Sequence, residues 1–337
     1  MSDLGTDAGP TRTPTQTIAG SVALSLLASP LNVHILQALS EEPKSLLDLR
    51  KAVGSPPQST MRLYSRTLSE KGILERRRRP EVQSSIYYEL TPGGQKLIEV
   101  AEVLERWLAG APAGPTALGS TAWKSTTKAL VGGWSFNIVR ALAARALSLT
   151  ELNQVIPETS YHSLGRRLEE MRLARLVEPQ PSGRRGTAYG ATNWLRRSIV
   201  PMIAAAAWER RHRPPGARQI GRLGVEAAYL LAIPLLRMPA AFSGRFRLAV
   251  QVPADTAPLF AGVLVGFDRG AVVACSSRLD GEADVWISGA PGAWLKRMGR
   301  LEHDGLEIAG DTAAAGELLN ELSDLAALPP SPDGGPV

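Results

Sequence analysis

The sequence has a single cysteine and lacks the residue groupings from which enzymes build catalytic and metal sites. Cys275 alone cannot form an internal disulfide or a cysteine-based zinc site. The four histidines, His34, His162, His212 and His303, have no metal-ligand spacing. Neither a glycine-rich phosphate loop nor a Gly-x-Ser-x-Gly motif occurs. We therefore predict a protein that is not an enzyme, with no catalytic residue, no metal and no cofactor.

Long apolar runs are also missing from the sequence. No stretch reaches the roughly eighteen apolar residues that a membrane-spanning helix needs. The N-terminal segment is polar and rich in Thr, Gly and Pro, unlike a signal peptide. These absences predict a soluble cytoplasmic protein that does not contact a membrane. Residues 1–20 and 327–337 are expected to be disordered tails.

Acidic residues are scarce in one part of the chain only. Residues 1–213 contain 28 Lys and Arg against 18 Asp and Glu, whereas residues 214–337 contain 10 against 14. The excess of positive charge therefore belongs to the first two thirds of the chain. This distribution is expected if that part binds nucleic acid and the remainder does not.

Residues 21–110 have the pattern of a winged helix-turn-helix domain. Apolar residues recur at helical spacing in three short segments, and the third begins after a Gly-Ser-Pro-Pro break. In this third segment Met61, Tyr64 and Leu68 should face the core, which leaves a polar and basic face exposed, as in a recognition helix. The residues of that face that we predict to contact DNA are Gln58, Ser59, Thr60, Arg62 and Arg66.

A run of four arginines follows the predicted recognition helix. It leads through a polar turn into the β-rich segment 86–90, so two short strands around a basic tip are expected. Such a wing would place cations against the DNA backbone or in the minor groove. Its predicted DNA contacts are Arg76, Arg77, Arg78 and Arg79.

The same pattern returns at a constant offset of 103 residues. Seven apolar positions from Ile35 to Leu74 recur from Ile138 to Val177, which favours an internal repeat. We expect a linker over residues 111–122 and a second winged helix over residues 123–213. The DNA contacts predicted for the second copy are Ser160, Tyr161, His162, Arg166, Arg184 and Arg185. Glu169 is expected on the same exposed face of the third helix as Arg166.

These residues resemble the HxlR-type winged-helix regulators of the wider MarR-like group. The resemblance rests on Leu90-Thr-Pro-Gly-Gly94, on Leu68-Ser-Glu-Lys-Gly-Ile-Leu74, and on Trp134 with Ile138-Val-Arg-Ala-Leu142 and Leu149-Thr-Glu-Leu152. It implies DNA binding and transcription regulation. Members of the family usually have one such domain and dimerise, so two in one chain imply either an internal pseudo-dimer or a homodimer. The N-terminal cysteine of the family is absent.

Residues 217–326 change character after a Pro-Pro break. A helix from Arg222 to about Leu236, several alternating strands and a last helix over 312–325 predict an α+β layer. Asp284-Val-Trp-Ile-Ser288 and Asp304-Gly-Leu-Glu-Ile-Ala-Gly-Asp311 resemble the sterol-carrier-protein-type fold. That fold holds lipid-like ligands, which implies an apolar pocket. Its candidate lining residues are Tyr229, Phe246, Phe260, Trp286 and Trp294.

The whole chain is thus expected to be mainly α with small β wings, with two tandem winged helices followed by a sterol-carrier-like domain for ligand binding or dimerisation. Two functions remain open. In the first, the chain is a regulator that binds double-stranded DNA and responds to an apolar small molecule. In the second, it is a carrier or sequestering protein for such a molecule, with the winged helices as scaffold. A salt-dependent affinity for DNA separates the two.

Overall fold

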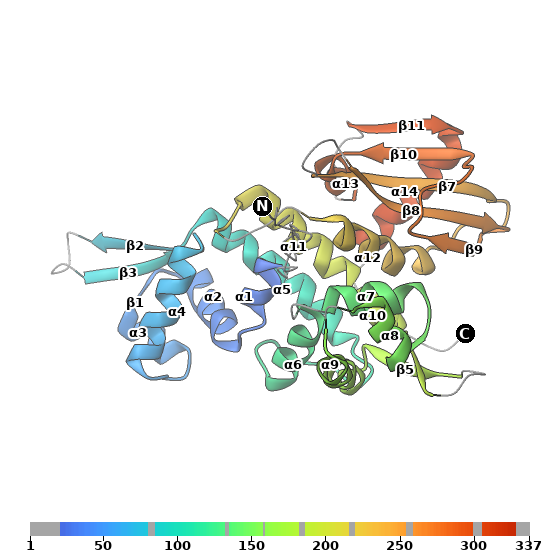
Figure 1. Ribbon diagram of the computed structural model, residues 1–337. Coiled ribbons are helices and arrows are strands. Elements are labelled where there is room, and N and C mark those ends of the chain that lie inside the picture. The colour runs from blue at the N-terminus through green and yellow to red at the C-terminus, as the bar shows by residue number, and fades with distance from the viewer. Residues whose placement is uncertain are drawn as a thin grey trace, which may run out of the picture.

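The computed structural model describes residues 21–79, 85–131, 135–157, 159–181, 186–215, 220–253, 259–298 and 305–327. We refer to α1 through α5 as the N-terminal unit, to α6 through α11 as the middle unit, and to α12 through α14 as the C-terminal unit. Figure 1 shows the N-terminal unit at one end of the molecule and the five-stranded sheet of the C-terminal unit at the other.

The N-terminal unit combines short helices with a three-stranded sheet of order β1-β3-β2. Ser45 caps the start of the helix α3 (Leu46–Ala52). Its side chain accepts a hydrogen bond from the Asp48 backbone N–H, which satisfies a donor at the helix start. Its elements are α1 (Val22–Leu27), α2 (Pro30–Glu41), β1 (Lys44–Ser45), α3 (Leu46–Ala52), α4 (Gln58–Glu70), β2 (Leu74–Arg79), β3 (Ser85–Leu90) and α5 (Pro92–Ala109).

The middle unit repeats this order of elements, and its sheet has the corresponding order β4-β6-β5. Ser148 begins α8 as Ser45 begins α3, and Glu151 completes a capping box there. Its elements are α6 (Thr121–Val131), α7 (Ser135–Ala144), β4 (Leu147–Ser148), α8 (Leu149–Val155), α9 (Tyr161–Leu173), β5 (Val177–Gln180), β6 (Ala188–Ala191), α10 (Asn193–Arg197) and α11 (Ile199–His212).

Strand pairing fixes which residues of the two units correspond. Leu74 pairs with Leu90, and Val177 pairs with Ala191. The offset is therefore 103 residues at the start of the hairpin and 101 at its end, because the whole hairpin is two residues shorter in the middle unit. The threonine after each hairpin makes the same contacts. Thr91 donates its hydroxyl to the carbonyls of residues 72 and 73, and Thr192 donates to those of residues 175 and 176.

The last helix of each unit differs in continuity. In the N-terminal unit α5 is one helix, whereas its counterpart in the middle unit is divided at Ser198 into α10 and α11. Pro201 lies in the first turn of α11. Since proline has no backbone N–H, it cannot donate to a preceding helical carbonyl, which accounts for the interruption.

The C-terminal unit is a five-stranded sheet of order β11-β10-β7-β8-β9 with helices over one face. The strand β10 runs parallel to β7, and the other pairs are antiparallel. Pro234 follows α12, and the predicted helix to Leu236 continues there only as a short 3-10 turn. The elements are α12 (Arg222–Ala232), η1 (Ile233–Leu235), β7 (Gly244–Val252), β8 (Leu259–Asp268), β9 (Ala271–Ser276), β10 (Val285–Gly289), α13 (Pro291–Met298), β11 (Leu306–Gly310) and α14 (Thr312–Ala327).

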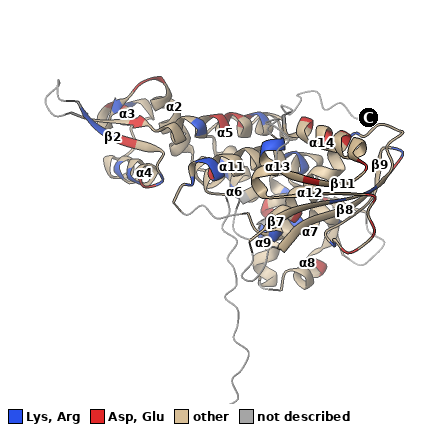
Figure 2. Cartoon of the chain, turned by 90° about the horizontal axis from the view of Figure 1, so that it is seen from above, with Lys and Arg blue, Asp and Glu red and all other residues tan. Residues whose placement is uncertain are grey.

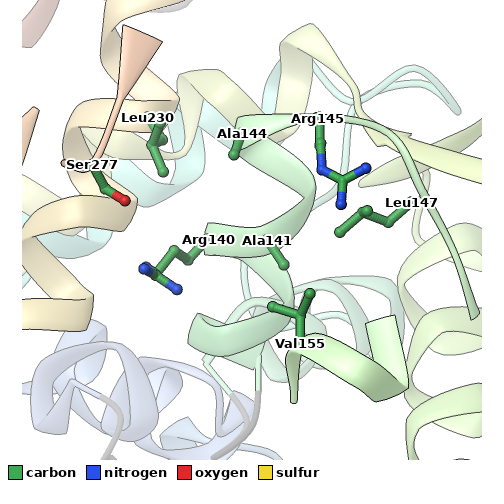
Figure 3. Close-up of a pocket in the computed structure, with 8 residues that line it drawn as sticks. All are labelled: Arg140, Ala141, Ala144, Arg145, Leu147, Val155, Leu230 and Ser277. Carbon is green, nitrogen blue, oxygen red and sulfur yellow. The ribbon is translucent and has the colours of Figure 1, made fainter. Parts of the chain in front are cut away.

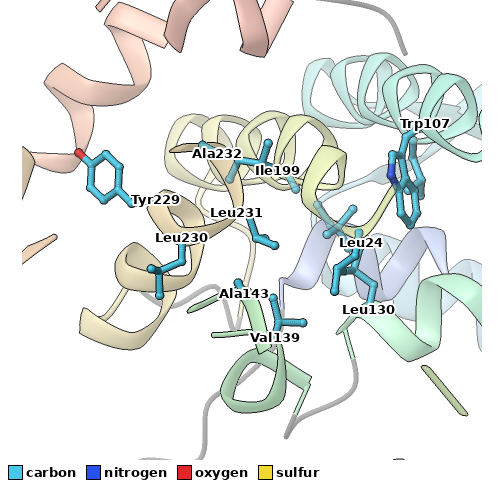
Figure 4. Packing of buried hydrophobic residues seen from close by; sticks show 14 of the residues in the cluster. Leu24, Trp107, Leu130, Val139, Ala143, Ile199, Tyr229, Leu230, Leu231 and Ala232 are labelled. Carbon is cyan, nitrogen blue, oxygen red and sulfur yellow. The ribbon is translucent and has the colours of Figure 1, made fainter. Parts of the chain in front are cut away.

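The helix α12 joins the C-terminal unit to the middle unit. Figure 4 shows Leu230 and Leu231 on the side of α12 that approaches Val139 and Ala143 of α7, whereas Tyr229 points away from them. All five side chains are buried. The apolar core therefore runs without a break from the middle unit into the C-terminal sheet.

Candidate nucleic-acid interface

The exposed face of α4 is polar and basic, as the sequence predicts. Met61 and Leu68 are fully buried, and this fixes the rotation of the helix. Gln58, Ser59, Arg62 and Arg66 are exposed, and Thr60 is half-buried.

Leu63 also lies on this face and is 61% exposed, although it was not among the predicted contacts. Its signal was available, because it interrupts the amphipathic pattern of α4. An exposed leucine on a recognition helix can contact a thymine methyl group.

The two arginines of α4 differ in their partners. Arg66 forms an ion pair with Glu70, one turn along the helix, at 2.7 Å between Nε and Oε1. Arg62 has no such partner among the described residues. Because both members of the Arg66 pair are exposed to water, the pair is worth little and a phosphate can replace the carboxylate. Arg62 is free to contact a ligand without that exchange.

The hairpin β2–β3 carries the arginine run on two different faces. Arg77 contacts Glu75 at 2.7 Å and Glu89 at 2.5 Å, and these contacts raise the pKa of its guanidinium, the hydrogen bond that it donates to Glu75 contributing most. Arg76 and Arg78 alternate with Arg77, so they lie on the opposite face of the strand.

Both Arg76 and Arg78 are exposed, and neither has a carboxylate partner among the described residues. Figure 2 shows basic residues along β2 and on α4, at the end of the molecule far from the C-terminal unit. The side chain of Arg79 lies outside the described residues.

The corresponding helix of the middle unit, α9, has a weaker positive face. Ser160, Tyr161, His162 and Arg166 are exposed as predicted, and Ser160 caps the helix by accepting a hydrogen bond from the Ser163 backbone N–H. Most other charged residues of α9 pair with one another. These pairs are Arg167 with Glu170 and Arg172 with Glu169, both at 2.6 Å.

The hairpin of the middle unit is short and has one proline in its first strand and another directly after it. Pro179 lies in β5, which is an edge strand, and Pro181 follows it. Proline is tolerated at a sheet edge because no neighbouring strand needs its missing N–H. The predicted contacts Arg184 and Arg185 lie outside the described residues.

Four tryptophan side chains donate hydrogen bonds between the N-terminal and middle units, and two of these hydrogen bonds are equivalent. Trp107 of α5 donates its indole N–H to the carbonyl of Trp194 at 3.0 Å, and Trp208 of α11 donates to the carbonyl of Gly93 at 2.8 Å. With the offset of 101, Trp107 corresponds to Trp208 and Gly93 to Trp194. The two units therefore exchange equivalent hydrogen bonds, as the subunits of a two-fold symmetric dimer do.

The symmetry of this contact is incomplete. The Trp107 and Trp194 rings stack with centroids 4.7 Å apart, but glycine occupies the position equivalent to Trp194 in the other half. There the ring of His212 lies 5.6 Å from Trp208, and a Cβ atom built on Gly93 would be 3.3 Å from its Nδ1. An imidazole thus fills part of the space that an indole fills in the first half.

The five aromatic residues predicted to line an apolar pocket are divided between two faces of the C-terminal sheet. Tyr229, Phe246 and Trp294 are buried on the face covered by helices, where the Tyr229 and Trp294 rings meet edge to face at 5.5 Å. Phe260 and Trp286 are 38% and 39% exposed and lie 6.2 Å apart. Since the sheet stands between the two groups, it does not bring all five side chains to one cavity.

Polar groups in the C-terminal unit do not assemble a reactive centre in the part of the chain that the structure describes. Burial raises the pKa of the Cys275 thiol to about 11, so it is protonated at neutral pH and a poor nucleophile. Burial also raises the pKa of Tyr229. No group of three His, Cys, Asp or Glu side chains within the described ranges could hold a metal ion. No described helix is long and apolar enough to cross a bilayer.

Comparison with known proteins finds a family match for most of the N-terminal unit. Residues 26–112 match the HxlR-like helix-turn-helix family. These residues, called the HxlR-like segment below, run from the end of α1 to just past α5. They include α4 and the hairpin β2–β3 with its arginines. It indicates a DNA-binding transcriptional regulator, and it describes no catalytic domain.

Two further comparisons say less about function. A solution structure of a conserved hypothetical protein from Thermus thermophilus, described as a possible sterol carrier protein, is 24% identical with a TM-score of 0.22. The alignment covers 29% of this chain and 76% of that protein. No curated protein matches the chain.

Proposed function

We propose that this protein is a transcriptional regulator that binds duplex DNA through α4 and the hairpin β2–β3. The observation that carries the proposal is the exposed basic surface of Arg62, Arg66, Arg76 and Arg78 inside the HxlR-like segment. Arginine can bind guanine edges in the major groove, and wing arginines supply affinity through phosphates that does not depend on sequence. In this arrangement Gln58 and Ser59, at the start of α4, contact base edges.

We further propose that the middle unit is a second winged helix, so that one chain acts as its own dimer. The repeated order of elements, the matching strand pairs and the equivalent Trp107 and Trp208 hydrogen bonds support this duplication. A chain of this kind needs no partner copy to present two recognition helices. The two helices carry different residues, so the DNA site should be asymmetric rather than a perfect palindrome.

The C-terminal unit is proposed to modulate DNA binding when a small molecule is bound. Its helix α12 packs on α7, so a change in the C-terminal unit has a direct route to the middle unit. Modulation requires that the ligand bind more tightly to one arrangement of the units than to another. If DNA affinity is the same with and without each ligand that binds, the C-terminal unit has another role.

The test is a DNA-binding titration at several salt concentrations on the DNA upstream of the protein's own gene. The parent chain is compared with Arg76→Ala/Arg78→Ala and with the control Arg237→Ala/Arg269→Ala, which removes the same charge from exposed positions of the C-terminal unit. Each lost phosphate contact should reduce the slope of log affinity against log salt by about 0.9. We expect a decrease of roughly two for the wing variant and little change for the control. Failure of the parent to bind at low salt would favour the carrier function instead.

A further inference from the structure

We propose that the junction between the middle and C-terminal units binds a small organic anion with a short apolar body, such as a single-ring carboxylate. The inference goes beyond the regulator function, because anion binding at this junction can be tested without DNA. It rests on a pocket, on the arginines around that pocket and on the shortage of carboxylates to balance them.

The pocket lies where α7, the end of α8 and the C-terminal unit meet. Its volume is about 130 Å³. Figure 3 shows Leu230 and Ser277 on one side, Leu147 and Val155 on the other, and α7 between them. Five of the eight lining residues are apolar, and the polar ones are Arg140, Arg145 and Ser277.

Arg140 is already positioned by a buried carboxylate. Its Nε donates to Oε2 of Glu226, whose side chain is only 1% exposed, and Arg222 donates to the other oxygen of Glu226 at 2.7 Å. One carboxylate therefore serves two guanidinium groups. Because Glu226 holds only one edge of each guanidinium, the remaining N–H groups of Arg140 are available to a second anion.

Arg196 adds a further positive charge beside the pocket. Its guanidinium donates to the backbone carbonyls of Ala143 and Leu230, at 3.3 and 2.9 Å, and no described carboxylate forms an ion pair with it. The Arg196 side chain is half-buried, and this burial lowers its pKa. A half-buried cation held only by neutral carbonyls makes the junction favourable for an anion.

Arg145 is the residue best placed to bind an incoming anion. Its side chain is 61% exposed, and its contact with Glu151 is long, at 3.7 Å. The second oxygen of Glu151 is engaged in capping α8. In all, Arg140, Arg145, Arg196 and Arg222 meet only Glu151 and Glu226 among the described residues at this junction. The excess positive charge identifies the ligand as an anion.

The volume of the pocket limits the size of the ligand, and its apolar lining favours an apolar body next to the charged group. Pockets for drug-sized molecules begin at roughly 300 Å³, so 130 Å³ admits no more than about one ring with a charged group. Ala141, Ala144 and Val155 would contact the apolar part. The Ser277 hydroxyl, which has no partner among the described residues, would complete the polar side.

The test uses benzoate as the probe and benzamide as its uncharged analogue, with binding to the full chain measured by calorimetry at low salt. Arg145→Gln is compared with Arg269→Gln, since Arg269 is also exposed and makes a similarly long contact, 3.5 Å, with Asp268. We expect saturable binding of benzoate and none of benzamide. Arg145→Gln should weaken benzoate binding by roughly tenfold or more, and Arg269→Gln should leave it unchanged.

A second variant fills the pocket without removing charge. Ala144→Phe adds a ring at an exposed position of the lining, so it should abolish benzoate binding while the melting temperature without benzoate stays near that of the parent. Binding that does not saturate, or that falls equally in Arg145→Gln and Arg269→Gln, would overturn the proposal and indicate general attraction of anions to a basic protein. Full binding by Ala144→Phe would place the anion elsewhere and overturn it as well.

Discussion

Where α4 presents Arg62 and Arg66, the corresponding positions of α9 hold Gly165 and Glu169. The two helices have the same length and share buried apolar positions, so this difference is confined to the exposed face. Glycine has no side chain that could bind a base or a phosphate, and a carboxylate repels phosphates. The two helices therefore keep matching buried positions while their exposed faces differ in charge at these positions.

In the hairpin too, arginines of the N-terminal unit correspond to uncharged residues of the middle unit. Arg76 and Arg78 of β2 correspond to Pro179 and Pro181 in the middle unit. The middle unit instead packs α7 against α12. In the proposed regulator the N-terminal unit provides most of the DNA affinity, whereas the middle unit connects DNA binding to the C-terminal unit.

The largest effect is expected at the contact between the two units, where Trp107 and Trp208 differ in their neighbours. Trp107→Ala removes a buried indole together with its stacking on Trp194, and it should cost about 3–5 kcal/mol of unfolding free energy. Trp208→Ala should cost less by about 0.5–1.5 kcal/mol, because its ring neighbour is His212 rather than a stacked indole. Urea denaturation followed by circular dichroism measures both. Equal costs would show that the stacking adds nothing.

The next effect concerns DNA affinity and tests whether α4 and α9 contribute unequally to the proposed DNA binding. Arg62→Ala should weaken binding by about 1–3 kcal/mol, whereas Arg166→Ala on α9 should weaken it by less. In the opposite direction, Glu169→Arg should strengthen binding, because it replaces a repulsive carboxylate with a cation and restores the residue type found at Arg66. Fluorescence anisotropy on one duplex compares the three variants. A larger loss from Arg166→Ala than from Arg62→Ala would reverse the proposed roles of the units.

The sequence was sufficient for the parts of the fold that depend on local pattern. The period of apolar residues around Met61 and Leu68 predicted which face of α4 is exposed, and the strands of the C-terminal unit were found from their alternation. The interruption between α10 and α11 was missed, although Pro201 was a visible signal for it.

Contacts between distant segments were beyond the reach of the sequence. The hydrogen bond from Trp208 to Gly93 joins residues 115 apart, and no local pattern encodes it. The pocket at Arg140 and Arg145 depends on Glu226 and Ser277 arriving from another unit. The grouping of Phe260 with Trp286, apart from Phe246, follows from strand register, which the sequence alone left undetermined.

A smaller effect is expected at the second residue after the end of α4 and of α9. Gly72 has a φ of +71°, and the corresponding Arg175 has a φ of +57°. A side chain in this left-handed region costs about 1–2 kcal/mol, and glycine avoids the cost. Arg175→Gly should therefore raise the unfolding free energy by about 1 kcal/mol, and Gly72→Ala should lower it by a similar amount.

No heavy atom lies within 4 Å of a Cβ built on Gly72, so that substitution tests backbone conformation alone. Thermal unfolding of the two variants gives the comparison. A fall in stability for both would mean that Arg175 makes contacts that outweigh its strained backbone.

The smallest effect is a dependence on pH that arises from the asymmetry of the contact between the units. Burial lowers the pKa of His212 below its usual 6.5, and the charges of Arg211 and Lys96 lower it further. The folded protein thus favours the neutral imidazole, so its contribution to stability is complete above about pH 6.5 and decreases as the pH falls toward the folded pKa. His212→Gln cannot be protonated and should lose less stability than the parent between about pH 7.5 and pH 5.5. Melting temperatures at the two pH values measure this difference. An identical loss in parent and variant would assign the acid sensitivity to other groups and leave His212 as a space-filling partner of Gly93.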